Sequence, residues 1–248
     1  MNNIDFFRDE IRDGFYVPTA IKIAWAAALD VLAQIDRICT KYDITYFADW
    51  GTLLGAVRHG GFIPWDDDLD IGMKREDYLR FREVADKELP SNYTIHDYKR
   101  KDDHWLFLAR VVNNDKMCFD DEYLREHYNF PWLVGVDIFI KDYLYRDEEE
   151  EKRRDDEIMQ LIAIANGVVE GGINASAVNT RLRDVENRHH ISIPEYSEGC
   201  DDNRTREIGI ALYELAEKLM SQVEEQDSDS IGQIFPFILK GNRGEPKE

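Results

Sequence analysis

The chain has 248 residues, of which 43% are hydrophobic and 12% aromatic, and this composition excludes an intrinsically disordered or collagen-like chain. Its 31 lysines and arginines against 51 aspartates and glutamates leave a net charge of −20. We therefore expect no nucleic-acid partner and no strong binding to anionic lipid, because both depend on basic surfaces.

The sequence carries no pattern of a membrane span or of export. No stretch approaches the roughly 18 to 20 apolar residues that a spanning helix needs, and the N-terminus lacks the cationic and apolar regions of a signal peptide. Three widely spaced cysteines, Cys39, Cys118 and Cys200, form neither a disulfide framework nor a zinc motif. We therefore expect a cytoplasmic protein with reduced cysteines.

The first part of the chain alternates strand and helix patterns. Apolar residues follow helical spacing from Thr19 until Asp43, and Gly60, Gly61 and Pro64 mark a loop. Helices are predicted for 19–43, for the residues that follow Gly51 up to about 59, and for 74–89, and strands for 44–50, 68–73, 93–98, 105–112 and 134–140. This pattern predicts an α/β (α+β) domain whose sheet is flanked by helices.

After Tyr145 the pattern becomes mostly helical. The acidic run 147–151 precedes Lys152, Arg153 and Arg154, and the i, i+4 spacing of opposite charges predicts a solvated helix face rather than a binding patch. We place a boundary near residue 146. Residues 1–146 then form the α/β domain, and residues 147–248 form a helical C-terminal region.

The segment 49–72 carries most of the functional signal. Gly51 and Thr52 stand where a predicted strand turns into a helix, and free backbone N–H groups, the helix dipole and a hydroxyl can together receive a phosphate there. A Gly-Thr pair before a helix is also an ordinary cap, so this feature alone is weak.

Four aspartates, Asp66, Asp67, Asp68 and Asp70, follow within five residues. The period of two places Asp68 and Asp70 on one face of a strand. Two carboxylates about 4 Å apart repel by about 4 kcal/mol at an effective dielectric constant of about 20, and a cation relieves this repulsion. Oxygen ligands favour Mg²⁺ or Mn²⁺. A polar turn that faces water is the alternative, but the Pro-Trp before it and the strand after it favour a metal site.

The stretch GTLLGAVRHGGFIPWDDDLDI, residues 51–71, resembles the signature of the LicD family, which includes the fukutin-related proteins. The resemblance implies a nucleotidyltransferase-like mixed sheet. It also implies transfer of a phospho-substituent from a CDP-activated donor, such as phosphocholine from CDP-choline in bacteria or ribitol phosphate from CDP-ribitol in animals. The acceptors it implies are hydroxyls of cell-surface glycans, teichoic acids or lipopolysaccharide.

Carried over by position, Gly51 and Thr52 match the family's phosphate-binding turn, and Asp68 and Asp70 match its paired metal ligands. Residues 135–140, Gly-Val-Asp-Ile-Phe-Ile, resemble the family's Val-Asp-Ile-Phe-Pro element and make Asp137 the third carboxylate. Ile140 stands where the family has proline, which leaves the following turn open. A Tyr-Gly-Asp segment common in the family is absent, so we expect either a truncated chain or a divergent member.

Further candidate residues have alternative interpretations. Arg58 and His59 lie inside the motif and are predicted to contact donor phosphate, or else to complement the C-terminal dipole of a helix. Arg110 is predicted to clamp a phosphate or to form a buried ion pair. Trp50 and Trp65 are able to stack on a base or on a choline ammonium, although core packing is favoured for both.

The resulting hypothesis is that Asp68, Asp70 and Asp137 hold Mg²⁺ or Mn²⁺ against the donor diphosphate, with Asp137 as general base for the acceptor hydroxyl. A lipid-linked acceptor implies at most peripheral contact, at the inner face of a membrane. Two alternatives stay open. One is a glycosyltransferase that uses Asp68-Leu69-Asp70 as an Asp-x-Asp motif, and the other is a catalytically silent nucleotide-binding domain.

Overall fold

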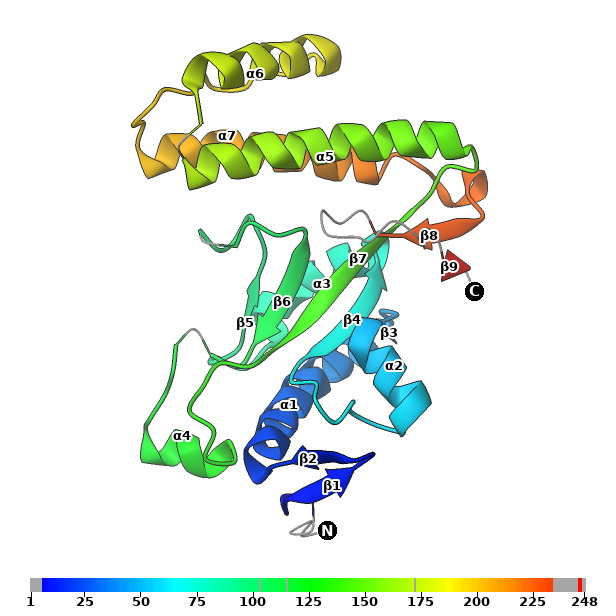
Figure 1. The fold of residues 1–248 in the computed structure, drawn as a ribbon, viewed down its shortest axis with the longest axis vertical. Coiled ribbons are helices and arrows are strands. Elements are labelled where there is room, and N and C mark those ends of the chain that lie inside the picture. The colour runs from blue at the N-terminus through cyan, green and yellow to red at the C-terminus, as the bar shows by residue number, and fades with distance from the viewer. Residues whose placement is uncertain (1–5, 103, 115, 172, 234–244, 247–248) are drawn as a thin grey trace. The chain divides into compact units, whose positions relative to one another are not determined.

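The computed structural model describes residues 6–102, 104–114, 116–171, 173–233 and 245–246 (Figure 1). The chain divides into two compact units, residues 1–141 and residues 142–248, and each is described by itself. It is a mixed α/β protein in which a mixed sheet is flanked by helices. Within the described ranges, no helix combines the length and the apolar character needed to cross a membrane.

The first unit contains the predicted alternation of helices and strands. Its elements are β1 (Glu10–Arg12), β2 (Phe15–Val17), α1 (Thr19–Tyr42), β3 (Phe47–Ala48), α2 (Trp50–His59), β4 (Leu69–Lys74), α3 (Arg75–Glu88), β5 (Thr94–His96), β6 (Leu108–Val112), α4 (Asp121–Glu126) and β7 (Gly135–Tyr143), whose last two residues belong to the second unit. The strand predicted for 44–50 is reduced to two residues. The reason is that Asp49 already caps α2, so the helix begins at Trp50.

The sheet of the first unit has the strand order β3-β4-β7-β6-β5. The central pair β4 and β7 is parallel, with Leu69 opposite Val136 and Lys74 opposite Lys141. The other neighbouring pairs are antiparallel. The strands that carry the motif aspartates and Asp137 are therefore adjacent, although more than sixty residues separate them along the chain.

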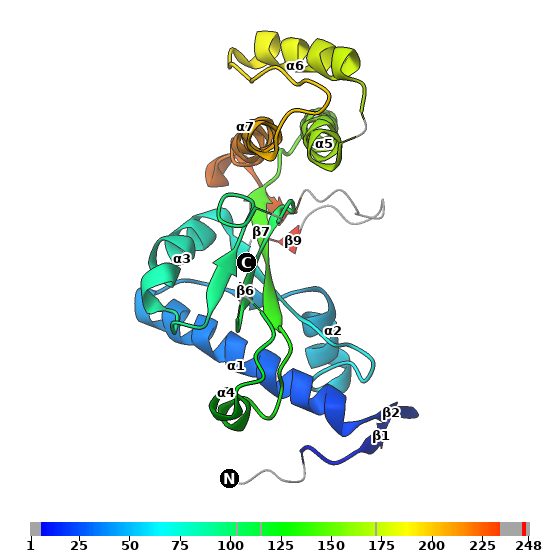
Figure 2. The ribbon, with the colours of Figure 1, turned by 90° about the vertical axis from the view of Figure 1, so that its left-hand side faces the viewer.

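The period of two divides this sheet into an apolar face and a polar face. Helices α1 and α3 cover one face, and α2 lies on the other side (Figure 2). The apolar core under α1 and α3 is formed on the sheet side by Leu69, Ile71, Met73, Ile95, Ala109, Val111, Val136, Ile138 and Ile140. The residues between them, including Asp70 and Asp137, therefore point to the face that carries α2.

The second unit is mostly helical, with α5 (Glu148–Glu170), α6 (Ala175–His189), α7 (Asp202–Met220), a 3-10 turn (Glu225–Asp227), β8 (Ser230–Gly232) and β9 (Glu245–Pro246). Helices α5 and α7 pack side by side, and the Tyr213 hydroxyl donates to Asn166 Oδ1 over 2.9 Å. The end of β7, Asp142 and Tyr143, pairs with β8, and β8 pairs with β9.

One helix face in this unit differs from the sequence prediction. Lys152 and Arg153 are exposed as expected, but Glu151 and Arg154 are buried. Arg154 Nη2 donates to Glu151 Oε1 over 2.7 Å, and its Nη1 donates to the carbonyl of Met220. The prediction of a solvated face is wrong for these two residues, because their side of α5 faces α7 and the chain that precedes α5.

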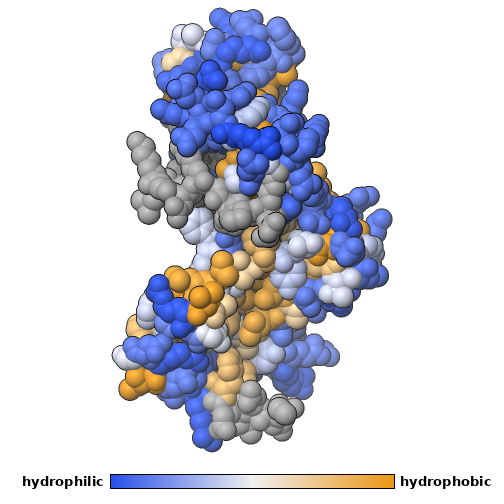
Figure 3. Space-filling model, turned by 90° about the vertical axis from the view of Figure 1, so that its right-hand side faces the viewer, coloured by the Kyte–Doolittle hydropathy of each residue, from blue (hydrophilic) through white to orange (hydrophobic). Residues whose placement is uncertain are grey.

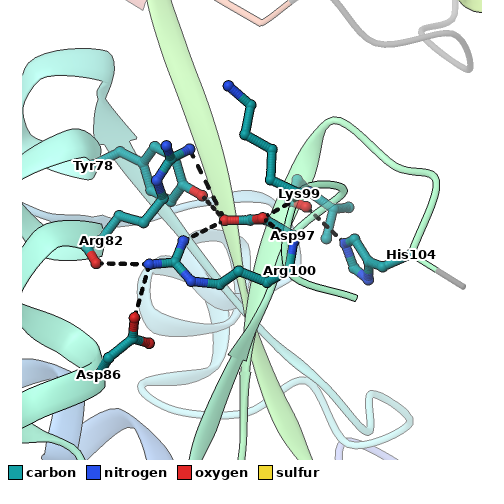
Figure 4. Close-up of polar contacts among 8 residues, drawn as sticks. Tyr78, Arg82, Asp86, Asp97, Lys99, Arg100 and His104 are labelled. Atoms are coloured by element: carbon teal, nitrogen blue, oxygen red, sulfur yellow. Dashed lines mark hydrogen bonds and ion pairs between the residues drawn. The ribbon is translucent and has the colours of Figure 1, made fainter. Parts of the chain in front are cut away.

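A second buried charge connects α3 to the chain that follows β5. Asp97 accepts hydrogen bonds from Arg100 Nη1 at 2.7 Å, from the Tyr78 hydroxyl at 3.2 Å and from the Lys99 N–H at 2.9 Å (Figure 4). Burial favours the protonated acid, but Arg100 and the backbone N–H outweigh it and hold the pKa of Asp97 below its usual value. This carboxylate is therefore structural, with its charge compensated inside the protein.

We predict that Arg154→Met lowers the stability of the second unit by about 3 kcal/mol, because it leaves the Glu151 carboxylate buried without its cation. Hydrogen exchange of the α5 and α7 peptides measures this effect. Arg153→Met is the matched control, since Arg153 is exposed, and is expected to change stability by less than about 0.5 kcal/mol. Equal exchange in the two variants contradicts the prediction.

We predict that Asp97→Asn destabilises the protein by about 2 kcal/mol at pH 7. A carboxylate with a lowered folded pKa stabilises above its unfolded value of 3.8 and loses this contribution as the pH falls through the folded pKa. The free energies of unfolding of wild type and variant, measured by urea denaturation, are therefore expected to differ less at pH 3.5 than at pH 7. Asp86→Asn, which removes an exposed partner of the same Arg100, is the control and has little effect at either pH. If the difference in the free energy of unfolding does not change with pH, the charge of Asp97 is not its cause.

Candidate functional site

Four polar residues on the α2 face of the sheet lie in one row. Asp70 of β4 is opposite Asp137 of β7, Asp137 is opposite Arg110 of β6, and Arg110 is opposite His96 of β5. Residues directly opposite one another on neighbouring strands point to the same face and contact one another. We call Asp70, Asp137, Arg110 and His96 the polar row.

Three further carboxylates approach the row from the loop before β4. One oxygen each of Asp66, Asp67 and Asp68 lies within 4.8 Å of the others. The loop is held by the Asp66 backbone, whose carbonyl accepts from Trp25 Nε1 over 2.7 Å and whose N–H donates to the Ile63 carbonyl over 3.0 Å. The four motif aspartates are thus collected at the start of β4.

The start of α2 is built against these carboxylates. A Cβ at Gly51 would lie 2.5 Å from Asp66 Oδ2, so the glycine lets the Asp66 carboxylate lie against the start of α2 in its present position. The Gly51 N–H donates to the Asp70 carboxylate, and Thr52 Oγ1 accepts from the Asp70 N–H over 2.7 Å. Gly51 and Thr52 therefore contact a carboxylate of the polar row directly, and their role as a phosphate-binding turn stays a prediction.

A buried ion pair holds the start of α2 in place. Asp49 caps the helix through the Trp50 N–H at 3.0 Å, and its other carboxylate oxygen lies 2.6 Å from Lys141 Nζ of β7. Both side chains are buried. Trp50 has φ +41°, a left-handed conformation that is rare for an aromatic residue, so the cap and the ion pair hold the backbone in a strained geometry.

The carboxylates raise one another's pKa. Burial raises the pKa of Asp70 to about 7, with contributions from Asp68 and Asp137, while the Gly51 N–H acts in the opposite direction. Burial and the charge of Asp66 raise the pKa of Asp68 to about 6. A divalent cation relieves this repulsion, and an all-oxygen donor set fits Mg²⁺ or Mn²⁺. Metal binding by Asp68, Asp70 and Asp137 stays a prediction.

Arg110 is engaged by the third carboxylate of the set. Its Nη2 donates to Asp137 Oδ2 over 2.6 Å, and its Nε donates to Asp137 Oδ1. A Cβ at Gly135 would lie 2.8 Å from Arg110 Cγ, so glycine leaves the space that the arginine side chain crosses. Of the two interpretations left open for Arg110, the ion pair is present, although the arginine side chain is 45% exposed rather than buried.

Two other motif residues are not brought to the polar row. His59 Nδ1 lies 2.7 Å from Asp13 Oδ2, in the turn between β1 and β2, and its ring meets Trp65 edge-on at 6.0 Å. Arg58 is exposed and has no hydrogen bond or ion pair with the part of the chain that the structure describes. Their predicted contact with donor phosphate is untested.

The two motif tryptophans are exposed, so the favoured prediction of core packing is wrong. Trp50 is 49% exposed and Trp65 is 57% exposed. Trp50 also meets Phe139 of β7, at 5.8 Å between ring centroids, on the face of the polar row. The outer side of α2 continues this apolar surface with Leu53, Leu54 and Val57, and apolar side chains gather on the corresponding face of the first unit in Figure 3.

Two histidines that no sequence motif indicated lie at the far end of the row. His96 is opposite Arg110, and the ring of His104 lies 6.4 Å from that of His96. His104 Nε2 bonds the carbonyl of Leu108 over 2.8 Å, and a carbonyl only accepts, so this nitrogen carries the proton. Burial, His96 and Arg110 lower the pKa of His104. Strand pairing places His96 beside Arg110, and a hydrogen bond to Leu108 places His104 beside His96, and no local sequence pattern encodes either contact.

The fold and the site define a mixed α/β domain with a cluster of carboxylates on two adjacent strands beside the start of a helix. Comparison with known proteins identifies this class. Residues 43–123 match the sequence model of the LicD/FKTN/FKRP nucleotidyltransferase domain. The resemblance predicted from the motif is thereby confirmed, and Asp137 lies beyond the matched range.

Individual relatives match shorter or longer parts of the chain. The lipopolysaccharide cholinephosphotransferase LicD of Haemophilus influenzae is 45% identical over 67 residues, 27% of this chain and 25% of that protein. An uncharacterised protein of Rickettsia prowazekii is 46% identical over 121 residues, 46% of this chain and 45% of that protein. The human ribitol 5-phosphate transferase FKRP is 53% identical over 34 residues, 14% of this chain and 7% of that protein. The chain therefore matches less than half the length of these relatives.

We predict that Lys141→Met lowers the stability of the first unit by about 3 kcal/mol, because it leaves the Asp49 carboxylate buried without its cation. The double variant Asp49→Asn, Lys141→Met recovers much of this loss, since asparagine is also a good helix cap and carries no charge. Urea denaturation followed by tryptophan fluorescence measures both, because the five tryptophans of the chain all lie within residues 1–141. If the losses of stability caused by Asp49→Asn and Lys141→Met simply add in the double variant, the two side chains are not energetically coupled.

Proposed function

We propose that this domain transfers a phospho-substituent, phosphocholine or a related phospho-alcohol, from a CDP-activated donor to a hydroxyl of a cell-surface glycan, teichoic acid or lipopolysaccharide. The observation that carries the proposal is the meeting of Asp70, Asp137 and the loop aspartates beside Gly51 and Thr52. Support also comes from the matched LicD-family range and from two relatives named as a cholinephosphotransferase and a ribitol 5-phosphate transferase.

In this proposal Asp68, Asp70 and Asp137 hold Mg²⁺ or Mn²⁺. When bound, the ion offsets charge on the donor diphosphate and on the departing nucleotide. The Thr52 hydroxyl accepts from the Asp70 N–H, so its own proton is free to be donated to a donor phosphate oxygen. Asp137 takes the proton of the acceptor hydroxyl, once Arg110 no longer occupies both of its oxygens.

The exposed aromatic surface has a place in the same proposal. Trp50 precedes Gly51 at the start of α2, and its exposed ring offers a face to a donor base or to a quaternary ammonium group. A lipid-linked acceptor brings the domain to the inner face of a membrane as a peripheral protein. The net charge of −20 makes anionic lipid an unfavourable direct partner, so the acceptor rather than the bilayer provides the attachment.

The test is a thermal-shift panel with Mn²⁺ or Mg²⁺ and CDP-choline, CDP-ribitol, CDP-glycerol, CTP or UDP-glucose, followed by an assay for CMP release. A CDP-alcohol at about 100 times its dissociation constant is expected to add about 2.7 kcal/mol of stability, and only with metal present. Asp70→Asn is expected to abolish this shift. Asp77→Asn is the matched control, because Asp77 is a carboxylate of α3 with the same 8% exposure that is expected to leave the shift unchanged.

Each contrary outcome has a defined meaning. Stabilisation by UDP-glucose alone replaces the proposal with the glycosyltransferase alternative. Metal-dependent binding of a CDP-alcohol without CMP release, with lipopolysaccharide, teichoic acid and glycan acceptors each tested, replaces it with the silent binding domain. If Asp70→Asn and wild type show the same metal-dependent thermal shift, Asp70 is not part of the binding site.

A further inference from the structure

The side chains of the polar row are acidic at one end and basic at the other. Asp70 and Asp137 carry negative charge at one end, and Arg110, His96 and the neighbouring His104 form a basic end. The basic groups act on one another, since His96 and Arg110 both disfavour a proton on His104. The carboxylate of the row next to them, Asp137, is already paired with Arg110.

Arg110 and a metal ion compete for the same carboxylate. Nε and Nη2 of Arg110 engage the two oxygens of Asp137, one each, so a cation shared by Asp70 and Asp137 would bind a carboxylate that already carries the guanidinium charge. A divalent ion there repels the guanidinium and weakens the pair. The arginine side chain is 45% exposed, so it is able to move without disrupting the core.

The space between Arg110 and His96 is a candidate site for an anion that would pair with the Arg110 guanidinium. His96 lies directly opposite Arg110 on β5, on the side away from Asp137. In the state described here Nη1 of Arg110 has no hydrogen-bond partner among the described residues. An anion between Arg110 and His96 receives a bidentate donor from one side and an imidazole from the other, a combination that suits a phosphate group.

We propose that Arg110 and His96, with His104 beside them, form an anion-binding arm for the donor diphosphate, and that Arg110 leaves Asp137 for this anion when a divalent ion occupies the carboxylates. The inference rests on the proposed function, because it assigns one part of the same donor to the basic end of the row. His104 is a positioning residue. Its Nε2–H is held by the Leu108 carbonyl, and its ring packs edge-on against that of His96.

The proposal predicts opposite effects of one substitution on two ligands. Arg110→Met removes the cation that competes for Asp137, so Mn²⁺ alone is expected to bind about tenfold more tightly, a coupling of usual size. With Mn²⁺ saturating, inorganic pyrophosphate is expected to bind about tenfold more weakly to the same variant. Mn²⁺ electron paramagnetic resonance measures the first affinity, and titration calorimetry with pyrophosphate measures the second.

Two more variants complete the experiment. His96→Gln is expected to weaken pyrophosphate binding and to leave Mn²⁺ binding unchanged, because His96 faces the anion and not the carboxylates. Arg80→Met is the matched control, since Arg80 is also an arginine paired with an aspartate, at 3.3 Å from Asp77, but lies on α3 outside the row. It is expected to change neither affinity. Tryptophan fluorescence verifies that each variant is folded.

The outcomes separate this inference from the proposed function. Mn²⁺ binding by Arg110→Met that is unchanged or weaker than wild type shows a purely structural ion pair and overturns the inference, even if CMP is released normally. Pyrophosphate binding that His96→Gln leaves intact overturns it as well, and His96→Gln still decides the matter if Arg110→Met fails to fold. The predicted opposite shifts without a response to any CDP-alcohol uphold the basic arm and overturn the proposed donor.

Discussion

The parallel pairing of β4 with β7 is the constraint on which the candidate site depends. It places Asp70 opposite Asp137 and Lys74 opposite Lys141, and thereby sets which side chains meet on the polar face. A shift of one residue in this register turns one carboxylate toward the apolar core under α1 and α3. Because six consecutive residue pairs hold the register and their apolar members pack in the core, folding and site assembly are the same event.

Buried charge elsewhere in the protein is compensated by a close partner. Asp49 has Lys141, Asp97 has Arg100 and Glu151 has Arg154, each at 2.6 to 2.7 Å. The carboxylates at the start of β4 differ from these pairs. Their nearest charged neighbours include one another, and burial together with the charges of Asp68 and Asp137 raises the pKa of Asp70 to about 7. This acidic cluster is therefore the place where we propose that a cation binds.

The site also combines rigid and adjustable parts. Gly51, Thr52 and Asp49 are fixed by backbone hydrogen bonds, by the close approach of Gly51 to the Asp66 carboxylate and by a buried ion pair. Arg110, in contrast, has a partly exposed side chain whose stem passes over Gly135 and whose guanidinium pairs with Asp137. A rigid acidic centre beside a movable cation is a suitable arrangement for a reaction in which charge must be balanced before and after the donor arrives.

The sequence by itself predicted the longer helices and the central strands of the first unit and the acidic motif, because helical and strand periodicity are local and residues 51–71 are contiguous. It did not indicate the short elements β1, β2 and α4. Its resemblance to the LicD family, whose model matches residues 43–123, also made Asp137 a candidate. Only the tertiary structure decided that Arg110 pairs with Asp137, that His96 and His104 join the row, and that Trp50 and Trp65 are exposed. These facts depend on strand order, register and the side of the sheet that α2 covers. They arise from contacts between residues distant in the chain, which no local periodicity encodes.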